Sequence, residues 1–285
     1  MSRLGREPQV RELAERLGLG RTASPVEAIL AHCRQRIDRW VVEAGSVTTI
    51  GQLERLVTQR LQMVFEEVHA DEDFDRLKLT YARGRRELAF AALRIPFDDA
   101  RNPSYGVLIE CKNAPADAPD RFVAVIDCRG EKLARRFFTR WHEVIHRLTT
   151  HADHGEPAFR SQRDPIERLM DEIAGQVGFY EPLFGPVFEE QMRGKKLLSF
   201  ETAEVVRRLG FAEASFQATL SACCRRTPSP VIYVEAAVAH KAEDQREINR
   251  GQGRLFEDDQ PVAKLRAVEV VPNPAAQQAG SCWTT

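Results

Sequence analysis

The sequence predicts an α+β fold, in which a small antiparallel sheet packs on one amphipathic helix and additional helical segments surround both. The helix is expected over residues 132–148. Its apolar residues recur at steps of four, three and four: Phe137, Trp141, Val144 and Leu148. That spacing is typical of a helix face that packs on a core. Runs with strand composition come directly before the helix, separated by loops rich in Pro, Asp and Asn.

The elements before this helix change from helical to strand-like along the chain. Helices are predicted at residues 8–20, 24–41 and 50–68. The second of them begins with a capping box at residues 24–27, with proline at its first helical position. Strands are predicted at residues 77–82, 87–93, 105–111 and 121–128.

The elements after the helix are mainly helical. Helices are predicted at residues 164–177, 182–192, 200–209 and 214–224. Two strands follow, at residues 231–238 and 264–271, with a charged linker at residues 241–259 between them. From Asn273 onward we expect disorder.

The composition of the whole chain is that of an ordinary globular protein. Of its 285 residues 43% are hydrophobic, which is enough for a sizeable core. A formal net charge of -1 gives no global attraction to nucleic acid or to an anionic membrane. The sequence contains neither an apolar run of signal-peptide type nor a stretch long enough to span a bilayer. We therefore expect a cytoplasmic protein without a membrane partner.

The cysteines give no sign of a disulfide framework or a redox motif. There are six of them: Cys33, Cys111, Cys128, Cys223, Cys224 and Cys282. They show no Cys-x-x-Cys spacing, and an adjacent pair does not readily bridge to itself. In a cytosolic protein of this size we interpret them as free thiols that mostly serve packing.

The predicted helix carries the sequence His142-Glu143-Val144-Ile145-His146. Two histidines four residues apart lie on one face of a helix, here opposite the apolar face. With a glutamate beside the first histidine, this spacing is typical of a zinc site in which the glutamate acts as a base. The interpretation needs a third protein ligand, because catalytic zinc usually takes three and leaves a fourth position for water.

The third ligand is chosen from five downstream residues: His151, His154, Glu167, Asp171 and Glu172. Glu167 is the preferred candidate, because it begins a separate helix that can pack beside the first. It has a competing role, since a glutamate three residues after Asp164 can simply complete a capping box. Asp171, one turn further on, is placed to accept a hydrogen bond from a ligating imidazole. Glu172 points to another face and is the second choice.

A metzincin-type arrangement is excluded by the residues at two positions. That arrangement requires glycine at position 149 and histidine at position 152. This chain has Thr149 and Ala152 there.

Residues 138–146 (FTRWHEVIH), followed by residues 166–174 (IERLMDEIA), resemble the ImmA/IrrE family of zinc metallopeptidases. That family has a Phe-Thr-x-Ala-His-Glu-Leu-Gly-His helix preceded by a small sheet, and then a helix of the form Glu-Arg-x-Ala-Asp/Asn-x-Phe-Ala. The spacing of the glutamate and aspartate is also similar to that of thermolysin-like gluzincins. The resemblance covers roughly residues 45–225.

The resemblance implies a zincin-type fold and a regulatory endopeptidase that takes one Zn²⁺. His142, His146 and Glu167 would bind the metal, and Glu143 would take a proton from the attacking water and later deliver it to the leaving amine. The expected substrate is a protein, such as the helix-turn-helix repressors that family members cleave to derepress stress-response or mobile-element genes. The group that stabilises the oxyanion is not identified by the residues alone.

The chain departs from the family pattern by adding bulk near the site. Trp141 stands in place of a small residue, Ile145 in place of the usual glycine and Met170 in place of alanine. Residues 178–182 (GFYEP) stand where an aliphatic run and proline are usual. None of these changes removes an expected ligand, so they bear on the substrate rather than on zinc binding. Candidates for oxyanion stabilisation are His151, His154 and Tyr180.

Four segments are expected along the chain. Residues 1–45 form an N-terminal helical segment, and residues 46–195 form the zincin-like metallopeptidase core. Residues 196–228 form a helical subdomain with a helix-turn-helix pattern. Residues 229–285 hold the C-terminal strands, the charged linker and the tail.

Two alternatives to the protease remain open. Residues 200–220 have a helix, glycine turn, helix pattern, and four arginines in or near them could contact phosphates: Arg207, Arg208, Arg225 and Arg226. Direct nucleic-acid binding by this segment is not favoured over a purely structural role in a helical subdomain. The second alternative is an inactive family member that binds a partner through the former cleft.

Overall fold

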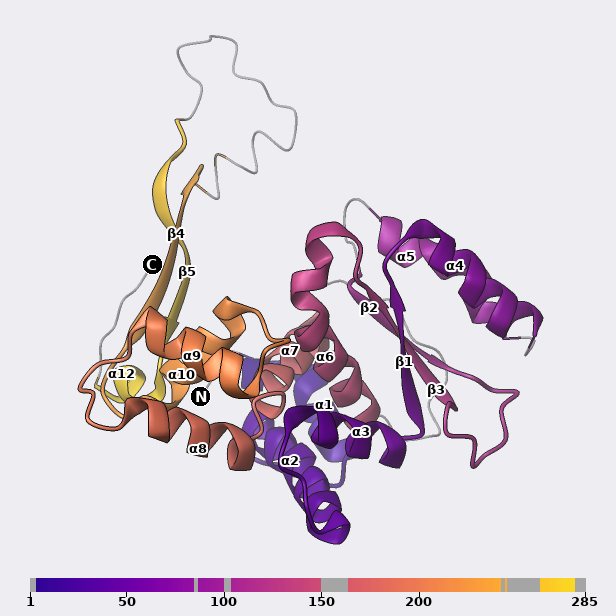
Figure 1. The fold of residues 1–285 in the computed structure, drawn as a ribbon, viewed down its shortest axis with the longest axis horizontal. Helices are drawn as coiled ribbons and strands as arrows, with labels where there is room; N and C mark the ends of the chain where they lie inside the picture. Colours follow the sequence, from indigo (N-terminus) through magenta and orange to yellow (C-terminus); the bar gives the residue numbers. More distant parts are fainter. Residues whose placement is uncertain are drawn as a thin grey trace. The chain divides into compact units, whose positions relative to one another are not determined.

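The computed structural model describes most of the chain (Figure 1). The described residues are 4–84, 87–99, 104–149, 164–241, 244 and 262–279. The chain divides into two compact units, Met1–Thr219 and Leu220–Thr285. The finer division into four segments stays a prediction.

A three-stranded sheet stands at the centre of the first unit. Its strands are β1 (Met63–Val68), β2 (Gly106–Glu110) and β3 (Phe122–Asp127), in the order β1-β3-β2. Strand β1 pairs with β3 in parallel and β2 pairs with β3 antiparallel. The α+β class is confirmed, but the sheet is mixed where we expected an antiparallel one.

The two faces of this sheet are covered by different segments. On one face, Val107, Ile109, Val123 and Val125 belong to a buried cluster with residues 74–97. That segment comprises α4 (Asp71–Leu77), a π-helical turn (Lys78–Arg83), a 3-10 turn (Leu88–Ala92) and α5 (Arg94–Asp98). The opposite face packs against α6 (Arg136–Thr149), which contacts both β2 and β3.

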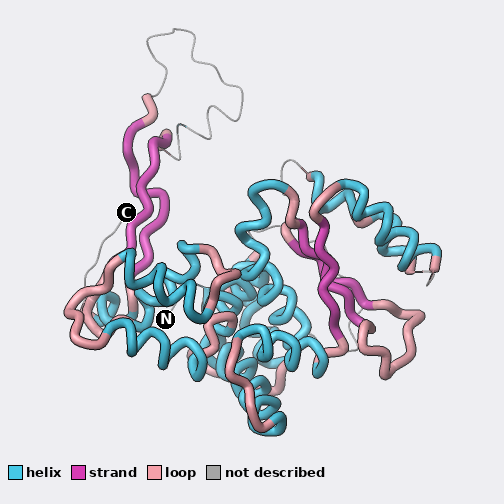
Figure 2. The backbone as a smooth tube through the Cα atoms, viewed as in Figure 1, coloured by secondary structure: helices cyan, strands magenta, loops and turns pink. Residues whose placement is uncertain are grey.

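The other helices of the first unit precede and follow α6, and Figure 2 shows how much of the unit is helical. They are α1 (Pro8–Arg16), α2 (Pro25–Ala44), α3 (Ile50–Arg60), α7 (Pro165–Val177), α8 (Glu181–Met192) and α9 (Phe200–Gly210). Helix α6 packs most extensively on α7, and α2 contacts both of them. Within the described residues, no helix is long and apolar enough to cross a membrane.

The predicted apolar face of α6 is confirmed. Phe137, Trp141, Val144 and Leu148 are all buried, with a 3-10 turn at Gly130–Arg135 leading into the helix. The helix therefore begins four residues later than predicted. Because the apolar face is buried, the opposite side of α6 is the one that faces α7.

The predicted helix at residues 50–68 is wrong in its second half. Helix α3 ends at Arg60, and Gln62 takes a positive φ of 53° before β1 begins. The backbone amide of Phe122 donates to the carbonyl of Gln62 at 2.9 Å, so the pairing with β3 starts at once. The apolar residues of 61–68 fit a helical period, but pairing with a distant strand decides the conformation.

The two strands predicted at residues 77–82 and 87–93 are also wrong. These residues form the π-helical and 3-10 turns on the sheet. Tyr81 stacks on Phe90 with ring centroids 4.4 Å apart, and both rings are buried in the cluster on that face. The apolar residues serve to cover the sheet rather than to extend it.

Two smaller predictions about chain termini and caps also need correction. Ser24 begins α2 without a side-chain cap bond, so the predicted capping box is not formed. The disorder expected from Asn273 onward is wrong for residues 274–278, which form a short helix, α12 (Pro274–Gln278), and residues 280–285 lie outside the described part of the chain. Asn273 is buried, its Oδ1 accepts from the amide of Ala276 at 2.8 Å, and this cap holds the helix start.

The second unit is built on a two-stranded antiparallel sheet. Strands β4 (Ile232–Ala239) and β5 (Lys264–Pro272) are both confirmed within one or two residues of their predicted ends. Helix α10 (Phe216–Arg226) crosses the boundary between the units. The linker predicted at residues 241–259 lies largely outside the described residues.

A network of charged side chains around Asp127 fixes the position of the segment that leads into α6. The carboxylate of Asp127, at the end of β3, has no exposed side-chain surface. It accepts from Arg129 Nη2 at 2.8 Å and from Lys132 Nζ at 2.6 Å. Burial raises the pKa of Asp127, but these hydrogen bonds outweigh it and hold the pKa below the ordinary value. Arg129 also pairs with Asp98. Replacing Asp127 therefore removes the buried partner of Arg129, and replacing Asp98 removes an exposed one.

We expect Asp127→Asn to lower the free energy of unfolding by about 1–3 kcal/mol at pH 7, because a buried acceptor for two cations is lost. Asp98→Asn should cost less than about 1 kcal/mol, since the Asp98 side chain is 41% exposed. Urea unfolding of the three proteins gives the comparison. Equal losses in both variants would contradict the assigned role of Asp127.

The pH dependence of this effect has a definite sign. A carboxyl with a lowered pKa contributes stability above its unfolded pKa, and that stability is lost as the pH falls further. The difference between wild type and Asp127→Asn should therefore be full at pH 6–7 and should shrink below about pH 4. A difference that grows on acidification would contradict the cited direction.

Candidate metal centre

Helices α6 and α7 bring His142, His146 and Glu167 together. The Nε2 atoms of the two histidines are 3.0 Å apart. Glu167 Oε2 lies 3.2 Å from His142 Nε2 and 3.3 Å from His146 Nε2. The three atoms therefore form a nearly equilateral triangle at the surface between two packed helices.

The separation of these donor atoms fits a small divalent cation. Zinc binds imidazole nitrogen and carboxylate oxygen at about 2.0–2.2 Å in tetrahedral geometry, which places two ligand atoms about 3.3 Å apart. The three separations here are 3.0, 3.2 and 3.3 Å. Two histidines and one glutamate are also one of the ligand sets found at catalytic zinc sites.

The side-chain cap at the start of α7 comes from Asp164 and not from Glu167. Asp164 Oδ1 accepts from the amide of Ile166 at 2.8 Å and so supplies the side-chain cap. Glu167 Oε2 is turned to the two imidazoles. Its side chain is therefore available as a ligand, although that role stays a prediction.

Asp171 lies one turn after Glu167 and contacts the other nitrogen of His142. The distance from His142 Nδ1 to Asp171 Oδ1 is 2.8 Å. An ionised carboxylate only accepts hydrogen bonds, so Nδ1 carries the proton and donates it. In the neutral imidazole this leaves the lone pair on Nε2, which is the atom that faces Glu167 and His146.

The pKa shifts of His142 and Glu167 indicate that positive charge is stabilised between α6 and α7. Burial lowers the pKa of His142, but hydrogen bonds to Asp171 and Glu167 outweigh it and raise the pKa to about 10. Burial raises the pKa of Glu167, but the two histidines hold it well below its usual range. A divalent cation placed among these groups would displace the proton from His142 Nε2 and meet the same stabilising carboxylates.

Glu143 lies on a different side of α6 from the two histidines and is almost fully buried, with 4% of its surface exposed. Burial raises the pKa of its carboxyl. The residue that makes room for it is Gly106, the first residue of β2. A Cβ added at Gly106 would lie 2.5 Å from Glu143 Oε1 and 2.7 Å from Thr139 Cγ2. No sequence pattern singled out Gly106, because its importance depends on a contact between distant elements.

The bulky residues that depart from the family pattern are turned into the core. Trp141, Ile145 and Met170 are each no more than 1% exposed. The indole of Trp141 packs on Gly178, where an added Cβ would lie 3.0 Å from Trp141 Cδ1. The large residue and the glycine therefore compensate for each other behind the histidine face.

Of the three candidates for oxyanion stabilisation, Tyr180 lies in the part of the chain that the structure describes, and it is bonded elsewhere. Tyr180 is buried and its hydroxyl donates to Asp38 Oδ1 of α2 at 2.7 Å. His151 and His154 lie outside the described residues. Glu172, the second choice for the third ligand, is exposed on α7.

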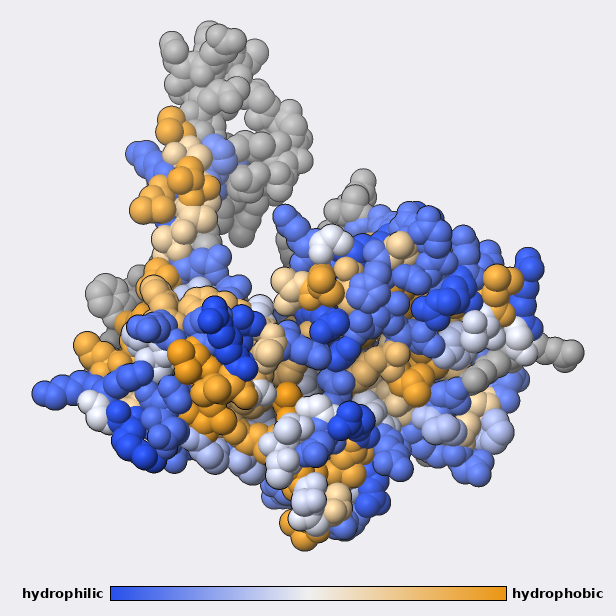
Figure 3. All heavy atoms as spheres, in the orientation of Figure 1, coloured by the Kyte–Doolittle hydropathy of each residue, from blue (hydrophilic) through white to orange (hydrophobic). Residues whose placement is uncertain are grey.

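The segment with the helix-turn-helix pattern forms two helices, α9 and α10, but two of its arginines hold the segment together. Arg207 pairs with Glu204 at 2.8 Å and donates to the carbonyl of Ala212 at 2.9 Å. Arg208 also pairs with Glu204, at 2.7 Å. Figure 3 shows hydrophobic side chains gathered over this helical region. Exposed members of it are Leu197, Phe200 and Leu209.

The five cysteines of the described residues are free thiols, as predicted: Cys33, Cys111, Cys128, Cys223 and Cys224. Cys282 lies outside those residues. All five are buried, which agrees with a packing role for most of them.

Comparison of the chain with known protein families, with curated proteins and with solved structures finds no match to any of them. The resemblance to the ImmA/IrrE family therefore stays a prediction from two motifs.

We expect Gly106→Ala to lower the free energy of unfolding by about 1–3 kcal/mol, because its methyl group would overlap the Glu143 carboxylate and Thr139. Gly106 is not among the glycines with positive φ, so the backbone itself accepts alanine. Gly51→Ala is the matched control, since a Cβ there meets nothing within 4 Å and a helix favours alanine. Denaturant unfolding of both variants is the measurement, and equal effects would contradict the contact.

Proposed function

We propose that this chain is a zinc-dependent endopeptidase with a regulatory role. The observation that carries the proposal is the triangle of His142 Nε2, His146 Nε2 and Glu167 Oε2, with sides of 3.0–3.3 Å. The buried carboxyl of Glu143 on the adjacent side of α6 supports it, because peptide hydrolysis needs a base next to the metal. The resemblance of residues 138–146 and 166–174 to ImmA/IrrE peptidases points the same way.

The residues have separate parts in the reaction. His142, His146 and Glu167 would hold Zn²⁺, which when bound lowers the pKa of water and polarises a scissile carbonyl. Asp171 keeps the His142 ring oriented and its proton on Nδ1. Glu143 accepts a proton from the attacking water and gives it to the nitrogen of the leaving amine. The raised pKa of its buried carboxyl suits both transfers, since the group has to bind and then release a proton.

The substrate in this proposal is a protein, and the resemblance suggests a helix-turn-helix repressor in the cytoplasm. The test is to incubate the purified protein with a repressor from its own host and to look for a cut. Cleavage should stop with a chelator and return with added zinc. A chain that binds zinc but cuts no such repressor would instead support the partner-binding alternative with an inactive site.

Nucleic-acid binding is not part of the proposal. Arg207 and Arg208 are paired with Glu204, which reduces the charge they could offer to phosphates. Salt-dependent binding of the protein to duplex DNA would be the finding that favours this alternative.

We expect Glu143→Gln to keep the metal and to lose at least about 10²-fold in hydrolysis, because the amide cannot accept the proton. His146→Ala should lose the metal itself, because only two of the three ligands remain. Zinc content by atomic spectroscopy and repressor cleavage are measured on the same preparations. Loss of zinc in Glu143→Gln, or full retention in His146→Ala, would contradict the assigned roles.

Asp171→Ala should weaken zinc binding about 10–100-fold without removing a ligand, because the His142 ring loses its acceptor. Asp171→Asn keeps an acceptor oxygen and should lie closer to wild type. Glu172→Gln is the control on the same helix, since Glu172 is exposed and adjacent. Competition with a chromophoric chelator gives the affinities, and equal affinity in wild type and Asp171→Ala would argue against this contact.

A further inference from the structure

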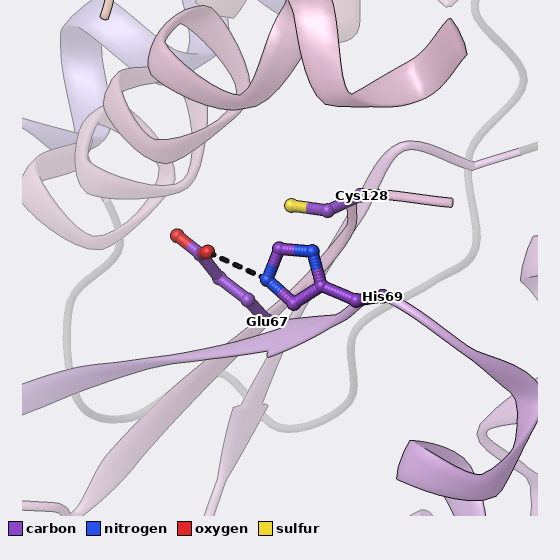
Figure 4. A group of neighbouring side chains, drawn as sticks. All are labelled: Glu67, His69 and Cys128. Carbon is purple, nitrogen blue, oxygen red and sulfur yellow. Dashed lines mark hydrogen bonds and ion pairs between the residues drawn. The ribbon is translucent and has the colours of Figure 1, made fainter. Parts of the chain in front are cut away.

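A second group of metal-binding side chains lies at the end of β1 and β3. Glu67 lies in β1, His69 directly follows that strand, and Cys128 directly follows β3 (Figure 4). One donor atom from each residue lies within 4.8 Å of the other two. His69 Nε2 and Glu67 Oε2 are 3.1 Å apart. The group shares no residue with the centre at His142.

We propose that Glu67, His69 and Cys128 form a second, sulfur-containing site for Zn²⁺. A thiolate, an imidazole and a carboxylate are all ligands that zinc takes in proteins, and sulfur favours zinc over harder cations such as Mg²⁺ or Ca²⁺. Figure 4 shows the three side chains facing a common space. The His69 side chain is 54% exposed, which leaves access for the ion and for a water as the fourth ligand.

Backbone hydrogen bonding fixes the positions of His69 and Cys128 relative to each other along the two strands. The amide of Cys128 donates to the carbonyl of Val68 at 2.8 Å and continues the parallel pairing by one residue. In a parallel pair, neighbouring residues in register point to the same face. Cys128 therefore lies beside His69 because of the sheet register, and not because of a loop conformation.

The charges around Glu67 leave one of its oxygens for a cation. Glu67 Oε1 accepts from Arg140, and Glu67 Oε2 faces His69 and also accepts from Arg136 Nη1 at 3.5 Å. Arg140 also pairs with Glu213 at 3.0 Å, and Arg136 pairs with the same carboxylate at 3.1 Å. Arg136 is closer to Glu213 than to Glu67, so an ion at Glu67 Oε2 would compete with the longer of its two contacts.

The thiol of Cys128 is not set up as a nucleophile. Burial, followed by the charge of Glu67, raises its pKa to about 11. A thiol of this kind is unreactive by itself. Coordination to zinc would replace its proton and give the buried sulfur a role that packing alone does not explain.

Occupation of the site would tie the sheet to the helix of the first centre. Glu67 would contact the ion through Oε2 while Oε1 keeps Arg140 of α6 in place. The ion would also join the ends of β1 and β3. Bound zinc would in this way help to fix the placement of α6 on the sheet.

Cobalt provides a specific readout, because Co²⁺ bound to a thiolate shows a ligand-to-metal charge-transfer band in the near ultraviolet and Co²⁺ bound only to nitrogen and oxygen does not. The full-length chain is stripped of metal, loaded with Co²⁺ and compared with Cys128→Ser and His69→Ala. Wild type should show the band, Cys128→Ser should lose it, and His69→Ala should bind Co²⁺ at this site at least about tenfold more weakly. Cys111→Ser, another buried cysteine of the same unit, should keep the band.

Zinc content separates this proposal from the proposed function. Wild type should hold about two ions per chain, and Cys128→Ser and His146→Ala about one each. Absence of the band in wild type, or its persistence in Cys128→Ser, would overturn the second site. Loss of zinc only in His146→Ala would overturn it too and leave the first centre intact. Because His69 is exposed, His69→Ala tests the site even where Cys128→Ser fails to fold.

Discussion

The close approach of helix α6 to Gly106 is the constraint on which the candidate metal centre depends. Only a residue without a side chain fits there, since Glu143 Oε1 occupies the space that a Cβ would need. This contact lays α6 flat on the sheet and buries the Glu143 carboxyl. The apolar face that includes Trp141 then enters the core, and the face with His142 is left toward α7. One packing contact thus sets the surroundings of Glu143 and the direction in which the two histidines point.

The parts of the fold that could be predicted from the sequence are those in which local pattern and final environment agree. The face of α6 follows from the spacing of Phe137, Trp141, Val144 and Leu148, and strands β2 and β3 are apolar enough to be recognised alone. Strand β1 could not be recognised, because Met63–Val68 follows a helix and becomes a strand only by pairing with residues about sixty positions away. The turns at Lys78–Arg83 and Leu88–Ala92 show the converse case, in which residues of strand composition find no strand partner.

The same division holds for the candidate site. The pair His142 and His146 and the distal carboxylates Glu167 and Asp171 follow from spacing within two helices, and the structure brings them together. Gly106 and the group at Cys128 depend on the sheet register, which no short motif encodes. The sequence departures at Trp141 and Gly178 also make sense only as a pair, because the indole packs on the glycine.

The order of the elements in the chain has a consequence for how the candidate centre can assemble. Strands β2 and β3 precede α6, and α7 follows it. Pairing of β2 with β3 and docking of α6 bring together segments that are near in the chain, whereas the parallel pairing of β1 with β3 closes a longer loop and is slower. During synthesis α6 can therefore dock on β2 and bury the Glu143 carboxyl before α7 supplies Glu167. The surroundings of Glu143 and the triangle of donor atoms thus form in separate steps.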